Sequence, residues 1–284
     1  MKVKKSKAVV GQEGETPTWD EFAWAAFLYK AMVGGDNDYQ GLMEQDQFLK
    51  NLRTNPAGVE PAKIQDPVIK FLNRWRCRTP NNPEAAEAIL DALRILQPCL
   101  QALSAFEIET VGFDLTITVN GNQITVHEAI AKCYRTLNEL RGFGATMTSK
   151  LLHILQPKLF IMWDSKILNH YWQSDQQVQD SGAGYCAFLQ AVKEIEERIS
   201  QSFMKAVSPD EANQGPAVYL SMKLEYNPPK TMAKYLDEYN WVKFANEVEV
   251  PPPSWLPMCR PVQSSTNGSY SSGANGAIVN RGYA

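Results

Sequence analysis

The stretch LRGFGATMTSKLLHILQPKLFIMWDSKI, residues 140–167, decides how this chain of 284 residues is interpreted. Gly142 and Gly144 stand one residue apart, and glycine permits the positive φ angles and close backbone approach of a tight turn. Apolar residues then recur at i, i+4, i+7 and i+8, the spacing of one helix face: Met147, Leu151, Ile154 and Leu155. Because residues 130–140 also suit a helix, we predict a helix, a glycine hairpin and a second helix at about 130–156.

This hairpin suggests an anion site. The second helix begins at the glycines, so its first N–H groups face outward and can bind a phosphate that approaches the small residues closely. The hydroxyl groups of Thr146, Thr148 and Ser149 can add donors. The alternative is that Gly142 and Gly144 only make a tight turn between helices, since a G-x-G pattern has low specificity.

The same stretch resembles the helix-hairpin-helix DNA glycosylase superfamily, whose hairpins have the form L-x-G-[VIF]-G. Leu140 to Gly144 matches that form, and Asp164 falls 22 residues after Gly142, where the superfamily keeps its catalytic aspartate. The apolar run 159–163 before Asp164 looks like the approach to that aspartate in the adenine-glycosylase branch. The resemblance covers about 30 residues, and it implies an all-α fold and DNA as the partner.

By this resemblance the hairpin residues hold the DNA backbone and the aspartate acts at the sugar. The predicted phosphate contacts are Gly142, Phe143, Gly144 and Thr146, with Thr148 and Ser149 as additional donors. Asp164 would stabilise the positive charge that develops on the sugar when an N-glycosidic bond breaks, and would orient the attacking water. The alternative is that Asp164 is the N-cap of the helix that starts at Ser165, and both roles can hold together.

Two departures from the family limit the chemistry. Bifunctional members carry a lysine two residues after the second hairpin glycine, where this chain has Thr146, so the resemblance implies a monofunctional hydrolase. Lys150 and Lys166 are candidate auxiliary groups, with phosphate contacts or solvated lysines as the alternatives. The cysteines are scattered, so we expect no iron–sulfur cluster, no metal site built from side chains and no required cofactor. A monovalent cation at the hairpin carbonyls is an optional ligand that the resemblance implies.

A glycosylase flips its target base out of the helix and stacks it in a pocket. Our candidate pocket residues are Trp163, Trp75, Asn73 and Trp24. The segment FLNRWRCR, residues 71–78, is the most basic part of the body, and its arginines can hold phosphate or form surface ion pairs. Aromatic residues at helical spacing also fit an ordinary core.

The rest of the chain predicts a helical body with disordered ends. We predict a flexible lead over 1–15, a helical body over 16–250 and a disordered tail over 251–284 that is rich in Pro, Ser and Gly. Helix signals include a capping box at Thr18, a stop at Gly34, a start at Asn82-Pro83, a capping box at Ser208, and long helices over 185–207 and 230–248. Alternation over 113–126 around Asn120-Gly121 predicts one β-hairpin inserted in this all-α fold.

Composition narrows the class of protein. Hydrophobic residues make up 44% of the chain, which is typical of a globular protein. The net charge of −3 counts against a protein that binds nucleic acid through a large overall positive charge. No apolar run is long enough for a membrane span, and the basic N-terminal residues lead into no apolar segment of a secretory signal. We therefore expect a cytoplasmic, nucleoid-associated or nuclear protein, not a secreted one; nothing indicates its oligomeric state.

Three functions stay open at this stage. The first is a monofunctional DNA glycosylase acting on a damaged, mismatched or modified base, in repair or in defence against phage DNA. The second is a nucleic-acid-binding module that keeps the hairpin without catalysis. The third is an N-glycosidase acting on RNA or on free nucleosides. No residue pattern selects the base.

Overall fold

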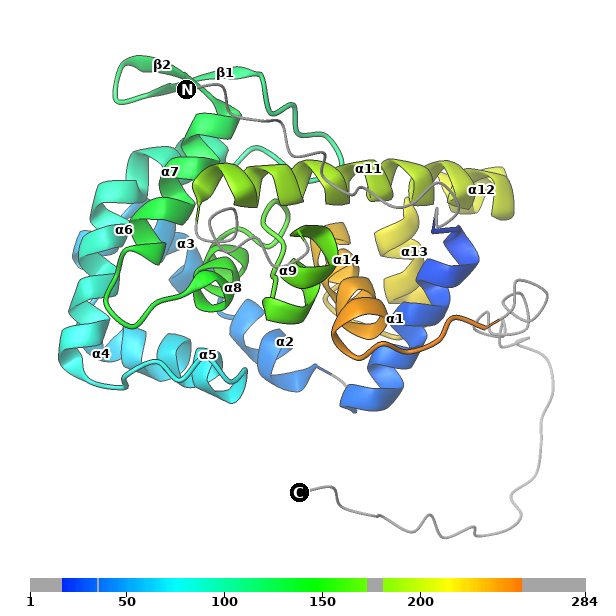
Figure 1. Cartoon of the computed structure of the whole chain (residues 1–284), viewed down its shortest axis with the longest axis horizontal. Helices are drawn as coiled ribbons and strands as arrows, with labels where there is room; N and C mark the ends of the chain where they lie inside the picture. Colours follow the sequence, from blue (N-terminus) through cyan, green and yellow to red (C-terminus); the bar gives the residue numbers. More distant parts are fainter. Residues whose placement is uncertain (1–16, 35, 173–180, 252–284) are drawn as a thin grey trace, which may run out of the picture.

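A computed structural model describes residues 17–34, 36–172 and 181–251, which are mostly helical with a small two-stranded antiparallel sheet (Figure 1). The predicted all-α class with a β-hairpin insertion is therefore confirmed at this coarse level. The predicted lead and all but the first residue of the predicted tail lie outside the described residues.

The predicted helix signals act where the sequence places them. Helix α1 (Trp19–Val33) begins with the Thr18 hydroxyl accepting from the Glu21 N–H, and it ends at Gly34, which has a φ of 72°. The Glu21 carboxylate does not complete the predicted capping box, because it accepts hydrogen bonds from Tyr239 and Lys243 of the C-terminal helix instead.

The longer helices also follow the predictions. Helix α6 (Pro83–Leu103) starts at the Asn82 cap, and α11 (Gly182–Ala206) covers the expected long helix. Ser208 and Glu211 form the predicted capping box at α12 (Pro209–Ala212). The helix predicted over 230–248 is α14 (Met232–Asn240), continued by the π-helical turn η3 (Trp241–Ala245). The remaining short helices and turns are α2 (Asn37–Met43), α3 (Asp46–Thr54), η1 (Pro56–Gly58), α4 (Pro61–Lys63), η2 (Ile64–Ile69), α5 (Lys70–Arg74) and α13 (Pro216–Lys223).

The β-hairpin is shorter than predicted. Strands β1 (Thr116–Val119) and β2 (Asn122–Thr125) pair through the turn at Asn120-Gly121, where both residues have positive φ angles of 50° and 79°. The expected extension of the second strand to Val126 is wrong. A capping box between Thr125 and Glu128 starts helix α7 there, and Val126 becomes its first residue.

The predicted helix, hairpin and helix are present. Helix α7 (Val126–Asn138) begins four residues earlier than expected because of that capping box, and α8 (Ala145–Leu155) follows the turn. Gly142 has a φ of 83°, which is why the turn needs glycine there. Helix α8 lies near the centre of the molecule in Figure 1 and packs against α3, α5 and α7.

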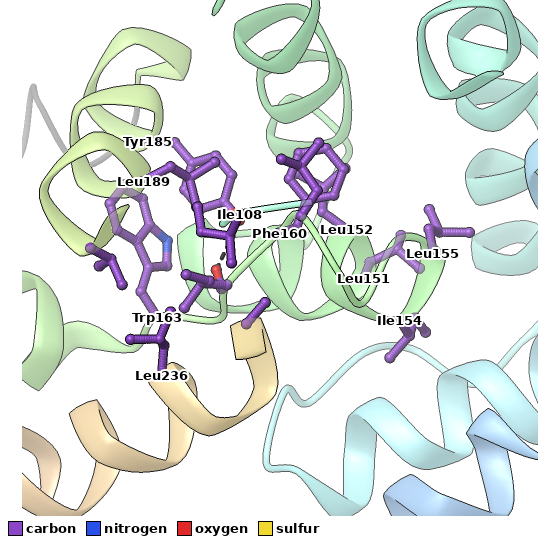
Figure 2. Close-up of a cluster of buried hydrophobic side chains, with 14 of the residues drawn as sticks. Ile108, Leu151, Leu152, Ile154, Leu155, Phe160, Trp163, Tyr185, Leu189 and Leu236 are labelled. Atoms are coloured by element: carbon purple, nitrogen blue, oxygen red, sulfur yellow. Dashed lines mark hydrogen bonds between the residues drawn. The ribbon is translucent and has the colours of Figure 1, made fainter. Parts of the chain in front are cut away.

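The segment that follows α8 is buried in the core. Figure 2 shows Trp163 beside Tyr185 of α11 and Leu236 of α14. The rings of Trp163 and Tyr185 lie 5.0 Å apart at 74°, and the Tyr185 hydroxyl donates to the Ile161 carbonyl at 2.8 Å. Helices from the middle and the end of the chain therefore hold residues 160–163 in place.

Helices α11 and α7 approach so closely that one position tolerates only glycine. A Cβ atom on Gly182 would lie 2.3 Å from the carbonyl oxygen of Ala131, a backbone atom that cannot rotate away.

We expect Gly182→Ala to lower the free energy of unfolding by about 1–3 kcal/mol, as overpacking does. Gly41→Ala is the control: its Cβ would meet nothing within 4 Å, so helix propensity should leave stability equal or slightly higher. Urea unfolding of both variants checks this, and equal stabilities would contradict it.

Candidate active site

A cleft of about 730 Å³ opens where α1, the end of α5, α8, the start of α9 (Ser165–Trp172), α14 and η3 meet. Several predicted site residues from separate parts of the chain share its lining: Trp75, Thr146, Lys150, Trp163, Asp164 and Lys166. The fold thus brings the predicted aspartate and the first turn of α8 to one cavity.

Asp164 is the N-cap of α9. Its Oδ1 accepts hydrogen bonds from the backbone N–H groups of Lys166 and Ile167, both at 2.9 Å. The predicted alternative, that Asp164 caps this helix, is therefore confirmed. Within the described part of the chain, Oδ2 accepts no hydrogen bond, and the side chain is partly exposed at the cleft. One oxygen is occupied by the helix, and the other can act on a ligand.

Three hydrogen bonds join Trp163, the residue before Asp164, to α8. The Ser149 hydroxyl donates to the carbonyl of Trp163 at 3.3 Å and lies 3.1 Å from its N–H, and the Trp163 indole donates to the Ala145 carbonyl at 3.1 Å. Because Trp163 is 1% exposed, these bonds are shielded from water. The backbone immediately before Asp164 is therefore tied to α8.

The turn from Gly142 to Gly144, here called the glycine corner, leaves the N-terminus of α8 without a side-chain cap. Gly144 occupies the N-cap with no side chain to accept from the helix N–H groups, whereas α1, α6, α7, α11 and α14 each have a Ser, Thr or Asn cap. A Cβ on Gly144 would meet nothing within 4 Å, so space outside this turn is free. Such uncapped N–H groups can bind an anion.

Two of the predicted phosphate donors are wrong. Thr148 and Ser149 are fully buried, and their hydroxyls bond inside the protein: Thr148 to Asn138 at 3.4 Å, and Ser149 to Thr146 and Trp163. A helix presents only some of its residues outward, and these two face the core. Thr146 lines the cleft, Gly142 and Gly144 are exposed, and Phe143 packs partly against the core.

The two candidate lysines line the cleft and hold it together. Lys150 donates to the Trp75 carbonyl at 2.7 Å and lies 5.7 Å from the centre of the Trp75 ring. Lys166 donates to the Ala245 carbonyl at 2.6 Å. Each ammonium group therefore ties two walls of the cleft to each other.

Of the four predicted base-pocket residues, Trp75 and Trp163 belong to the cleft lining, and Asn73 and Trp24 do not. Trp75 lines the cleft, with its ring 4.5 Å from Phe71. The ring of Trp163 is a core side chain, packed among Tyr134, Tyr185 and Phe188. The side-chain amide of Asn73 bonds the backbone of Thr79: its Nδ2 donates to the carbonyl at 2.8 Å, and its Oδ1 accepts from the N–H at 2.6 Å. Trp24 packs against the core away from the cleft lining.

The basic segment after α5 borders the cleft. Arg74 and Arg76 are exposed on the cleft lining. Arg74 forms an ion pair with Asp38, which is the alternative role predicted for these arginines from the sequence. Arg76 has a positive φ of 63°. The segment is fixed on α8 through Thr79, whose hydroxyl lies 3.1 Å from the sulfur of Met147.

Sequence reasoning missed the buried charges under the cleft. Lys234 of α14 is 0% exposed, and its Nζ lies 3.1 Å from Asp36, 3.1 Å from Asp237 and 3.5 Å from Glu238. Lys230 joins them at 2.6 Å from Glu238 and 3.5 Å from Asp36. The only available signal was the i, i+3, i+4 spacing of 234, 237 and 238, which also describes an exposed helix face.

Burial and charge act in opposite directions on this cluster. Burial alone would lower the pKa of Lys234, but the surrounding anions, Asp36 first, hold it well above its ordinary value. Burial also works to raise the pKa of Asp36, and Lys234 and Lys230 reverse this and lower it. For Asp237 and Glu238 burial dominates, and it raises the pKa of both. Three carboxyl groups thus share two ammonium ions.

Metal ligation finds no support in the described ranges: residues 17–34, 36–172 and 181–251 contain no group of three or more His, Cys, Asp and Glu placed to hold an ion. None of the described helices combines the length and apolar character needed to cross a bilayer.

Comparison with family models, curated proteins and solved structures found no match to this chain. The assignment of a function therefore depends on the cleft itself.

His153 links α8 to the segment before Asp164, and it should make stability depend on pH. Its ring bonds the Tyr39 hydroxyl at 2.9 Å and the Phe160 carbonyl at 2.6 Å, and burial lowers its pKa to about 3. An unfolded histidine has a pKa of about 6.5, so below that pH the unfolded state alone takes up the proton. The contribution of neutral His153 is complete above about 6.5 and is lost as the pH falls toward 3.

The measurement compares the wild type with His153→Gln by urea unfolding at pH 7.5 and pH 5. The stability advantage of the wild type should shrink by about 2 kcal/mol at pH 5, from about 1.4 kcal/mol per pH unit below 6.5. The comparison cancels other groups, such as Glu109, whose pKa burial raises to about 7 and whose effect has the opposite sign. An advantage that does not change with pH would contradict the assignment.

Proposed function

We propose that this protein is a monofunctional DNA glycosylase that hydrolyses the N-glycosidic bond of a damaged, mismatched or modified base, in the cell's own DNA or in phage DNA. The observation that carries the proposal is the shared cleft. The carboxylate of Asp164 and the first turn of the uncapped helix α8 open on the same cavity. That arrangement suits a substrate with a phosphate and a sugar side by side.

Each part of a nucleotide then has a partner. The backbone N–H groups after Gly144 and the Thr146 hydroxyl bind the phosphate, as helix N-termini bind anions. The sugar lies between this turn and Asp164. The flipped base enters the cleft and stacks on the exposed part of Trp75.

The reaction uses the charge of Asp164. As the bond from C1′ to the base breaks, the base leaves with the electron pair and takes a proton from solvent, and positive charge builds on the sugar. The carboxylate stabilises this cation through its uncommitted Oδ2. Water attacks C1′ from the opposite side to the leaving base, and its proton passes to Oδ2 or to solvent.

The hydrogen bonds of the two cleft lysines favour simple hydrolysis of the base over cleavage of the DNA strand by a lysine. A covalent Schiff base needs a neutral amine next to C1′. Lys150 and Lys166 donate to the Trp75 and Ala245 carbonyls, and Thr146 stands where the bifunctional family members carry lysine. The four cations of the cleft, Arg74, Arg76, Lys150 and Lys166, exceed its three acids, Asp38, Asp164 and Asp237, which favours a polyanion despite the negative net charge of the chain.

Asp164→Asn separates catalysis from structure. Asparagine caps helices as well as aspartate does, so the Tm should stay unchanged, while loss of the charge should lower the single-turnover excision rate by about 10³-fold. The assay measures alkali-induced scission of oligonucleotides that each carry one modified or damaged base. Wild-type excision that survives in Asp164→Asn would exclude the assigned role. DNA binding without any wild-type excision would favour the binding module, and hydrolysis of free nucleosides would favour the third function.

Gly144→Asp tests the phosphate site. The φ of −142° at Gly144 is open to any residue, and aspartate is a favoured N-cap, so the variant should be as stable as the wild type. Its charge would sit where the phosphate binds, and DNA affinity should fall by about tenfold or more. Gly144→Ala is the control, because its Cβ would meet nothing within 4 Å and it adds neither a charge nor a cap, so it should keep the wild-type affinity. Fluorescence anisotropy at several salt concentrations measures both variants, and a Gly144→Asp affinity equal to that of the wild type would make the hairpin a turn only.

A further inference from the structure

The floor of the cleft contains a carboxylate that the proposed hydrolysis does not use. Asp237 of α14 lines the cleft, whereas the other charged members of its cluster, Asp36, Lys230, Lys234 and Glu238, lie behind it. Its side chain is only 11% exposed. Of the charged side chains in this cluster, Asp237 is therefore the one that the cleft exposes to a ligand.

The two oxygens of Asp237 differ in their surroundings. Oδ2 lies 3.1 Å from the Nζ of Lys234, which donates a hydrogen bond to it. Oδ1 accepts no hydrogen bond from the described residues, although the side chain is almost buried. Oδ1 is therefore open to the cleft, where a ligand that brings an N–H group to it can form a charge-assisted hydrogen bond in a nearly enclosed site.

Aromatic residues line the same cleft as Asp237. Trp75, Tyr29 and Trp241 line the same cleft from three elements, and the rings of Tyr29 and Trp241 meet edge to face at 5.2 Å. Flat apolar surfaces around one acceptor are suited to a planar heterocycle that carries a donor on its edge. Lys234 lies 5.0 Å from the Trp75 ring and 4.8 Å from the Tyr29 ring, which fixes Asp237 and these two rings relative to each other.

We propose that Asp237 reads the edge of the flipped base and selects a base with an exocyclic amino group over one with a carbonyl at the same position. An amino N–H donates to Oδ1. A carbonyl oxygen there would face the lone pairs of the carboxylate, and both groups would lose their contacts with water. This inference rests on the proposed glycosylase function and names the substrate class of the same site.

Binding to DNA that cannot be hydrolysed tests the inference apart from catalysis. Oligonucleotides carry one 2′-fluoroarabino nucleotide, whose fluorine opposes the sugar cation and preserves the bond. Two pairs differ by amino against carbonyl at one position: adenine against hypoxanthine, and cytosine against uracil. Fluorescence anisotropy gives the Kd of each complex. We expect the wild type to prefer the amino member by about tenfold or more in the pair whose ring fits the cleft.

Asp237→Asn and Glu238→Gln form a matched pair of variants. The amide of asparagine can donate to a carbonyl, so Asp237→Asn should reduce or reverse the preference. Glu238→Gln also removes a carboxylate near Lys234, at 3.5 Å, but faces away from the cleft and should keep the preference. Circular dichroism and Tm measurements establish that both variants are folded. A preference lost equally in both would show that damage to the buried cluster, rather than base reading, causes the loss.

The outcomes separate this inference from the proposed function. Equal affinity for both members of both pairs, or a preference that Asp237→Asn leaves intact, overturns the inference even if the wild type excises bases. Excision that fails while the Asp237-dependent preference persists overturns the catalytic proposal and keeps the base-reading site. Absence of binding to any of the oligonucleotides overturns both.

Discussion

The structure depends on one ammonium ion held out of water. Lys234 lies at 0% exposure between carboxylates from the start of α2 and from its own helix, and three aromatic rings, Tyr29, Tyr39 and Trp75, surround it within about 5 Å. An ion in this position is tolerated only when its partners are close and well oriented, because removal of one partner leaves an uncompensated charge. The cluster therefore fixes α1, α2, the end of α5 and α14 around a single point. The floor of the cleft is the outer surface of that arrangement.

Local signals in the sequence were sufficient to predict most of the longer helices and the hairpin turn. The Thr18, Asn82 and Ser208 caps start helices because their side chains bond backbone groups three residues away, which is a local effect. The glycine corner was predictable for the same reason, since the positive φ of Gly142 is a property of the turn itself. Asp164 was singled out through the family resemblance, by its position 22 residues after Gly142, and the fold brings it to the cleft with Thr146.

The remaining site residues depend on how distant helices pack, which no local pattern records. Thr148 and Ser149 look like outward donors in a sequence, but the rotation of α8 against its neighbours turns them into the core. The Trp163 ring was misplaced because the packing of α11 encloses it. Asp237 and Trp241 were not predicted because they come from the end of the body and meet the other lining residues only in three dimensions. A residue that caps a helix, as Asp164 does, leaves a local signal in the sequence, whereas a residue such as Asp237 reaches the cleft only through tertiary packing.

The pairing of α1 with α14 has a consequence for protein synthesis. The Trp19 N–H donates to Ser202, and Glu21 binds Tyr239 and Lys243, so the first helix finds its partners about 200 residues later. While the ribosome is still translating the middle of the message, Phe22 and the other apolar residues of α1 have no native surface to cover them. A nascent chain of this protein must therefore keep its first helix from sticking elsewhere until nearly all of the body has emerged, and a prematurely terminated product would expose that helix as a binding site for chaperones.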